Sequence, residues 1–201
     1  MLAKVYSYGL SGLEAYPVTI EVDVAMGLPC TVIVGLPDNA IKESKERVRS
    51  AIKNSGYRFP LGRITVNLSP ADTKKEGPSF DLAIALGILG ASEQIDMSQL
   101  KNFVILGELS LDGYIQPITG TLCVALTMPK DKFQGLILPS LNAPEAAVTN
   151  QIKIFPAKQL CNVIHFLQNP DAILPFEGKD FFSFAQNKSC DMDFSDVKGQ
   201  F

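Results

Sequence analysis

The sequence lacks several features that would assign a function directly. It contains a single histidine, His165, to which we give no role, and its four cysteines form no CxxC pair, so no metal-ligand pattern is present. No stretch reaches about 18 uninterrupted apolar residues, and the N-terminus carries no basic segment followed by a long apolar run. These absences predict a cytoplasmic protein with no metal site and no membrane partner.

A nucleotide-binding loop is also missing. Such a loop requires the pattern GxxxxGK followed by serine or threonine, because its backbone N–H groups and lysine hold the phosphates. The Gly178-Lys179 pair is followed by Asp180, and Ile173 stands where the first glycine belongs. The sequence by itself is therefore not expected to bind or hydrolyse ATP.

The elements that the sequence does contain predict an α/β (α+β) domain. Its 201 residues, 46% of them hydrophobic, suit one domain with a buried core. Apolar alternation and helical periodicity place the elements. Strands are expected at 3–10, 18–25, 29–36, 63–68, 103–109, 135–138 and 152–155. Helices are expected between 38 and 56, with Asp38 as the N-cap, and at 79–91, 119–128 and 157–167, and a turn or helix is expected at 143–148. The nearly all-apolar helix at 79–91 is expected at the centre of the fold.

A serine stands at the predicted start of that central helix. Gly77 and Pro78 place the helix boundary, so Ser79 is expected to cap the helix or to lie in its first turn. Free N–H groups at such a position can hold an anion or an oxyanion, and a serine there can act as a nucleophile if a proton acceptor lies nearby.

Positive charge is concentrated in one region although the net charge is −3. Residues 42–75 carry nine lysines or arginines against three acidic residues. One interpretation is contact with a phosphate backbone, and the other is a solvated helix face with local ion pairs. The candidate nucleic-acid contacts are Lys42, Lys45, Arg47, Arg49, Lys53, Arg58, Arg63, Lys74 and Lys75. Reversing the charge of Arg47, Arg49 and Lys53 together is expected to abolish DNA binding if the first interpretation holds.

Several motifs in a fixed order resemble one family. They are Gly35-Leu36-Pro37-Asp38, Glu46-Arg47-Val48-Arg49, Arg63 to Leu68, Pro70-Ala71-Asp72, and Lys75-Glu76-Gly77 with Phe80-Asp81-Leu82. This order resembles the N-terminal domain of magnesium-chelatase-like AAA+ ATPases of the ComM/YifB group. The segment Gly107 to Gly120 resembles the proteolytic domain of Lon-type proteases, whose fold is also that of ribosomal-protein S5 domain 2.

The resemblance implies a mixed sheet packed with helices over residues 1–170. Residues 171–201 are then a linker to an AAA+ module that is absent from this sequence, and 193–200 resemble the entry into that module. The full-length relatives resemble hexameric, ATP- and Mg²⁺-dependent motors that act on branched DNA in recombination and natural transformation. The domain would contribute DNA contact and ring assembly, or alternatively bind partners without DNA affinity.

The likeness to Lon also raises a serine peptidase as a less favoured alternative. Ser79 falls at the position of the Lon nucleophile, and Val124 falls at that of the lysine that activates it. Since a serine nucleophile needs a neighbouring base, the dyad is expected to be degenerate and the domain non-catalytic. An insertion of magnesium into a porphyrin has only the family name in its support.

Overall fold

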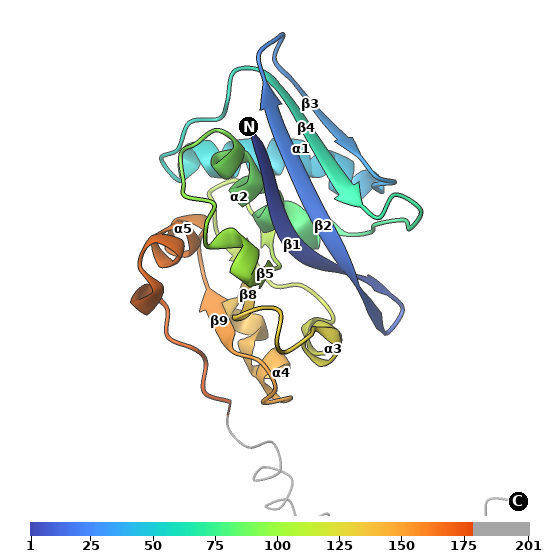
Figure 1. The fold of residues 1–201 in the computed structure, drawn as a ribbon, viewed down its shortest axis with the longest axis vertical. Helices are drawn as coiled ribbons and strands as arrows, with labels where there is room; N and C mark the ends of the chain where they lie inside the picture. Colours follow the sequence, from blue (N-terminus) through green and yellow to red (C-terminus); the bar gives the residue numbers. More distant parts are fainter. Residues whose placement is uncertain (179–201) are drawn as a thin grey trace, which may run out of the picture.

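The computed structural model describes residues 1–178, which form a mixed seven-stranded sheet packed with helices, as the sequence predicts (Figure 1). The sheet order is β3-β4-β2-β1-β5-β8-β9, and β6 and β7 form a separate hairpin. The strands are β1 (Leu2–Ser11), β2 (Glu14–Ala25), β3 (Cys30–Val34), β4 (Arg63–Ser69), β5 (Phe103–Ile105), β6 (Glu108–Leu109), β7 (Ile115–Gln116), β8 (Gly135–Pro139) and β9 (Ile154–Ala157). The helices are α1 (Asn39–Asn54), α2 (Asp81–Ala91), α3 (Thr121–Thr127), α4 (Ala143–Ala147) and α5 (Leu160–Gln168), with short 3₁₀ turns at Pro78–Phe80, Leu100–Asn102, Ser140–Asn142 and Pro170–Ala172.

One half of the sheet is covered on a single face. In this half β2 pairs antiparallel with both β1 and β4, and β3 runs parallel to β4 along the edge. Along β4 the buried residues Ile64, Val66 and Leu68 alternate with the partly exposed Thr65 and Asn67. This alternation is typical of a sheet that packs against the core on one side and faces water on the other. The inner face packs against the α1 and α2 residues of the main hydrophobic cluster.

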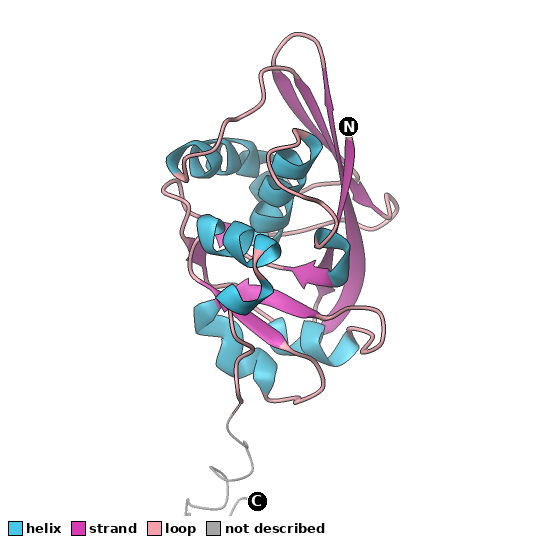
Figure 2. Ribbon diagram, turned by 60° about the vertical axis from the view of Figure 1, so that its left-hand side comes forward, coloured by secondary structure: helices cyan, strands magenta, loops and turns pink. Residues whose placement is uncertain are grey.

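The other half of the sheet is covered on both faces. Strands β5, β8 and β9 are parallel, and all five residues of β8 are buried. Ile105 and Ile137 belong to the main cluster with α2 and α5, whereas Val104 and Leu136 belong to a second cluster with α3 and α4. Figure 2 shows helices on both sides of these strands. Burial on both faces explains why these strands read as continuous apolar runs.

Helix α2 lies at the centre of the fold, as the sequence predicts. All eleven of its residues are buried. A Cβ atom built on Gly87 would lie 2.6 Å from Cγ2 of Val22, so the glycine lets the helix approach β2 closely. Because α2 is buried along its whole length, the residues that pack against its first turn are held in place.

The strand predicted at 103–109 is divided in two, because Gly107 turns the chain between β5 and β6. A Cβ atom there would lie 2.6 Å from Cγ2 of Ile115. Gly107 N–H donates to the Ser79 carbonyl at 2.9 Å, and its own carbonyl accepts from Leu82 N–H at 3.0 Å. The backbone of Gly107 is therefore hydrogen-bonded to the start of α2. These bonds join segments far apart in sequence, and strand periodicity does not predict them.

One further helix boundary differs from the sequence prediction. Strand β9 ends at Ala157, so the helix predicted from 157 begins only at Leu160. The predicted linker starts at 171, and within it Phe176 N–H donates to the Ile154 carbonyl at 2.7 Å, so the chain still contacts β9 at that point. The predicted entry into an AAA+ module, residues 193–200, lies outside the described residues.

Candidate nucleic-acid interface

Three predicted contact residues lie together on one face of α1. Helix α1 begins after Asp38, whose Oδ1 accepts the Ile41 N–H at 2.8 Å, as the sequence predicts for an N-cap. Lys45, Arg49 and Lys53 follow at four-residue intervals, which places them on the same side of the helix. We call these three residues the basic cluster. Lys42 is exposed one turn earlier on α1.

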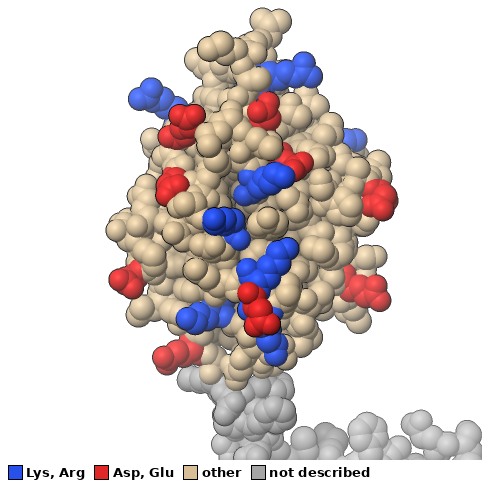
Figure 3. Space-filling model, in the orientation of Figure 1, with Lys and Arg blue, Asp and Glu red and all other residues tan. Residues whose placement is uncertain are grey.

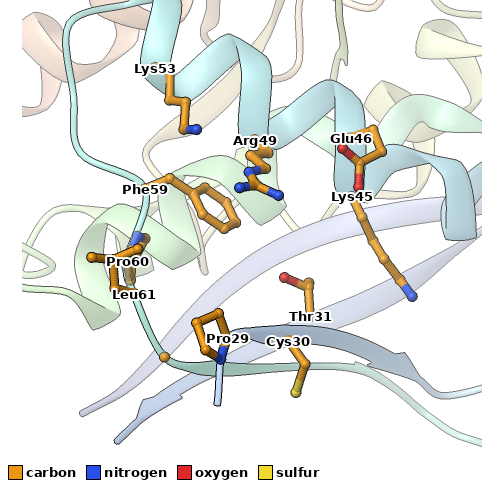
Figure 4. A pocket seen from close by; sticks show the side chains of 11 residues that line it. Pro29, Cys30, Thr31, Lys45, Glu46, Arg49, Lys53, Phe59, Pro60 and Leu61 are labelled. Atoms are coloured by element: carbon orange, nitrogen blue, oxygen red, sulfur yellow. The ribbon is translucent and has the colours of Figure 1, made fainter. Parts of the chain in front are cut away.

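The basic cluster lines a cavity of about 200 Å³ between α1, the start of β3 and the segment that precedes β4 (Figure 4). The Arg49 guanidinium carbon lies 5.7 Å from the centre of the Phe59 ring, a distance typical of a cation–π contact. Thr31 points into the cavity, whereas the Cys30 thiol points away from it. The cavity therefore combines three cations with one aromatic ring.

The charges of the basic cluster are available to an external anion. Glu46 also lines the cavity. Nevertheless, within residues 1–178 the ion pairs are Lys4–Glu21, Arg47–Asp81 and Lys74–Glu76, and none involves the basic cluster. Neighbouring cations that form no ion pair produce a positive potential that attracts phosphate. On the face drawn in Figure 3, basic side chains run down the middle, and acidic ones lie both among them and on either side.

Arg47, also predicted as a contact, is partly buried and bound to a buried carboxylate. Its Nε lies 2.7 Å from Asp81 Oδ2 and its Nη2 lies 3.2 Å from Asp81 Oδ1, while Nη2 also donates to the Ala40 carbonyl at 3.1 Å. The Asp81 side chain is 1% exposed and also accepts the Leu109 N–H at 3.3 Å. The pair links α1, α2 and β6. This geometry assigns Arg47 to the fold and removes it from the set of surface contacts.

The pKa of Asp81 follows from this environment. Burial is the largest influence and raises the pKa from 3.8 to about 6, against the opposing effect of the Arg47 guanidinium. A carboxylate in such a site depends on its arginine partner for its charge.

Lys75 is likewise excluded as a contact, because its side chain is fully buried. Its Nζ donates to the Thr73 carbonyl at 2.7 Å, and burial lowers the pKa of its ammonium group. Lys74 is exposed and pairs with Glu76. The prediction from local charge density fails at Lys75 because charge density in sequence carries no information about burial.

Two other candidates lie apart from the basic cluster. Arg63 is on β4 with Thr65 and Asn67, on the opposite face of the sheet from α1. Arg58 is exposed, and its backbone N–H is held by Gln94 Oε1 at 2.9 Å. The structure thus gathers three of the nine predicted residues into one cavity, and the other six do not line it.

Ser79 lies in the 3₁₀ turn Pro78–Phe80, and α2 begins two residues later at Asp81. Of the two positions expected for Ser79, a helix cap or the first turn, the structure has the second, because its hydroxyl forms no capping hydrogen bond and the 3₁₀ turn leads directly into α2, where the Gly107 carbonyl accepts the Leu82 N–H. Ser79 lines a surface hollow of about 550 Å³ together with the carboxylates of Asp38, Glu76 and Glu108.

The position expected for an activating lysine offers no base. Val124 is 2% exposed and packs in the second hydrophobic cluster on α3. Among the described residues that line the hollow around Ser79 there is neither a lysine nor a histidine. The geometry gives the Ser79 hydroxyl no basic side chain of the kind that activates a serine nucleophile.

Within residues 1–178, no helix is long and apolar enough to cross a membrane, and no group of three metal-ligating side chains is present.

Comparisons with known proteins give one consistent result. A family model described as subunit ChlI of Mg-chelatase matches residues 20–142. The competence protein ComM of Haemophilus influenzae is 41% identical over 201 residues, which cover 99% of this chain and 39% of that protein. The uncharacterized protein YifB of Salmonella typhimurium is 39% identical over 199 residues, which cover 99% of this chain and 38% of that protein.

A more distant likeness connects the chain to peptidases. Lon protease 2 of Thermus thermophilus is 26% identical over 162 residues, which cover 77% of this chain and 19% of that protease. The chain spans about two fifths of the length of the ComM and YifB relatives it matches.

Proposed function

Because the chain belongs to the ChlI-like AAA+ family of magnesium chelatase, with ComM and YifB as relatives, we propose that it is the non-catalytic N-terminal domain of an AAA+ ATPase. In this proposal the domain contacts DNA and contributes to ring assembly, and the complete protein acts in recombination or natural transformation. The relative that carries the name competence protein supports that biological setting.

The observation that carries the DNA proposal is the basic cluster. Lys45, Arg49 and Lys53 line one cavity, and none of them forms an ion pair within the described part of the chain. A row of lysine and arginine on one helix face neutralises successive phosphates and releases their counterions. With three such contacts, the affinity for a single strand is expected to fall about 20-fold when the salt concentration rises from roughly 50 to 200 mM.

ATP and Mg²⁺ are proposed for the complete protein and not for this chain. The sequence has no GxxxxGK-Ser/Thr loop, and residues 1–178 hold no acidic cluster fit for a metal. In this proposal the domain contacts DNA and supports assembly, and ATP is hydrolysed in another part of the complete protein.

A binding titration tests the proposal. The 201-residue chain is titrated into fluorescently labelled single-stranded, duplex and four-way branched DNA at about 50 and about 200 mM salt, and its oligomeric state is followed by sedimentation. We expect saturable binding at low salt that weakens steeply at high salt. Absence of binding to all three DNAs at low salt would contradict the proposal and favour a partner-binding domain.

Lys75→Met provides a separate check on the corrected contact set. Because Lys75 is fully buried, methionine retains its apolar stem and removes no surface charge. We expect DNA affinity and its salt dependence to stay unchanged, whereas Lys45→Met should reduce the salt slope by about one. An equal reduction in both variants would show that Lys75 reaches the DNA.

A further inference from the structure

Two short loops at one end of the sheet expose large apolar side chains. The loop from Met26 to Pro29 joins β2 to β3, and the segment from Pro60 to Gly62 precedes β4; neither contains a charged residue. Met26 is 102% exposed, Leu28 is 88% exposed and Leu61 is 92% exposed. We call these three side chains the apolar tip.

The two loops are held against each other by the sheet. Ala25, at the end of β2, pairs with Arg63 at the start of β4, and Cys30 N–H donates to the Gly62 carbonyl at 3.2 Å. A Cβ atom on Gly62 would lie 2.5 Å from the Ala25 carbonyl oxygen, so the backbones are in close contact there. The apolar tip is therefore carried on a supported end of the sheet.

The apolar tip adjoins the basic cluster. Pro29 and Leu61 line the same cavity as Lys45, Arg49 and Lys53. In Figure 1 the β2–β3 loop projects at the top of the molecule, and in Figure 3 the same projection carries no charged side chain.

This combination matches the chemistry of DNA, which presents phosphates on its outside and apolar base faces within the stack. Proteins that insert leucine, methionine or proline between base steps combine these wedges with lysine or arginine on the neighbouring phosphates. Leucine and methionine side chains that are almost fully exposed on supported loops present apolar surface to water, and a partner that buries this surface is favoured. A partner with both phosphates and accessible base faces satisfies the two halves of the surface together.

We propose that the apolar tip inserts between bases of a branched DNA whose phosphates bind the basic cluster. This inference rests on the proposed DNA contact and adds a binding mode to that contact. At a branch point, where base stacking is already interrupted, the tip fills the opened base step and keeps it unstacked. The substrate class is accordingly DNA with an interrupted stack, in preference to continuous duplex.

A second copy of the chain is a less suitable occupant. A stable protein interface uses about 20 to 30 residues on each side. The apolar tip consists of three side chains on two short loops, with a cationic cavity directly beside it. Cations at the border of a small projection favour a polyanion over a flat protein surface.

The test uses a branched DNA with 2-aminopurine at the junction, whose fluorescence rises when the base unstacks. The variant replaces Met26, Leu28 and Leu61 by serine in the 201-residue chain. The matched control is Leu13→Ser, because Leu13 is 86% exposed in the turn between β1 and β2, at the opposite end of the twelve-residue strand β2. All four positions are exposed, so the fold is expected to remain intact, and circular dichroism verifies this.

We expect the unchanged chain and Leu13→Ser to raise the fluorescence on binding. The tip variant should lose that rise while its affinity keeps the same salt slope, since the basic cluster is untouched. A full fluorescence rise in the tip variant overturns the insertion and leaves the proposed DNA contact standing. Loss of self-association in the tip variant, with unchanged fluorescence, would assign the tip to a protein interface, and absence of DNA binding by the unchanged chain overturns both proposals.

Discussion

Replacing Arg47 by methionine is expected to lower the free energy of unfolding by about 3 to 5 kcal/mol at about pH 8. The cause is Asp81, which is 1% exposed and receives two hydrogen bonds from the Arg47 guanidinium, at 2.7 and 3.2 Å. Without the arginine the carboxylate keeps the Leu109 N–H as its remaining partner among the described residues. A buried charge that has lost its partner costs far more than the net value of the pair.

The loss should depend on pH in a defined direction. Burial raises the pKa of Asp81 from 3.8 to about 6, so between these values the folded protein binds a proton that the unfolded chain releases. The contribution of Asp81 to stability is therefore fully present below the unfolded value and is lost as pH rises through about 6. Removing Arg47 raises the pKa further, so the destabilisation in Arg47→Met should be smaller at about pH 5 than at about pH 8.

Urea unfolding at the two pH values measures this effect. Arg49→Met is the matched control, because Arg49 is exposed on the same helix and should change stability by only about 0.5 kcal/mol. The double variant Arg47→Met with Asp81→Leu should recover most of the loss, since an apolar pair leaves no buried charge. Equal destabilisation by Arg47→Met and Arg49→Met would contradict the structural role assigned to the pair.

Reversing the charge of the basic cluster is expected to produce the largest change in DNA affinity. In Lys45→Glu, Arg49→Glu, Lys53→Glu, three phosphate contacts are lost and three repulsive carboxylates replace them. We expect affinity for a single strand to fall at least about 20-fold at roughly 50 mM salt, with the salt slope reduced by about two. Fluorescence anisotropy at several salt concentrations measures both quantities.

Arg47 is deliberately left out of this set. The sequence alone favours Arg47, Arg49 and Lys53 for charge reversal, but Arg47→Glu would place a carboxylate beside the buried Asp81. Such a variant would lose DNA binding through unfolding, and the result would carry no information about the interface.

The alternation of apolar residues in the sequence predicts strands β1 to β4 well. The Asp38 cap and the central position of α2 are also confirmed. These features depend on local patterns. The division at Gly107 and the start of α2 depend on contacts between segments far apart in sequence, so periodicity does not predict them.

The candidate site shows the same limit. The four-residue spacing of Lys45, Arg49 and Lys53 predicts a shared helix face, because helical geometry is local. The burial of Lys75 and the pairing of Arg47 with Asp81 arise from tertiary packing, which composition and charge counts do not contain. The exposed Met26 and Leu28 stand beside glycine and proline, which marks a loop but does not show that it adjoins the basic cluster.

The most direct test of DNA contact by the basic cluster compares two charge-reversed triples of equal net charge on the same branched DNA. One is Lys45, Arg49 and Lys53 to glutamate, and the other is the exposed Lys101, Lys130 and Lys153 to glutamate, which lie outside the cavity. We expect the first triple to lose most of the affinity and of its salt dependence, while the second stays within a few-fold of the unchanged chain. Equal weakening by both triples, or no weakening by the first, would contradict the assignment of DNA contact to the basic cluster.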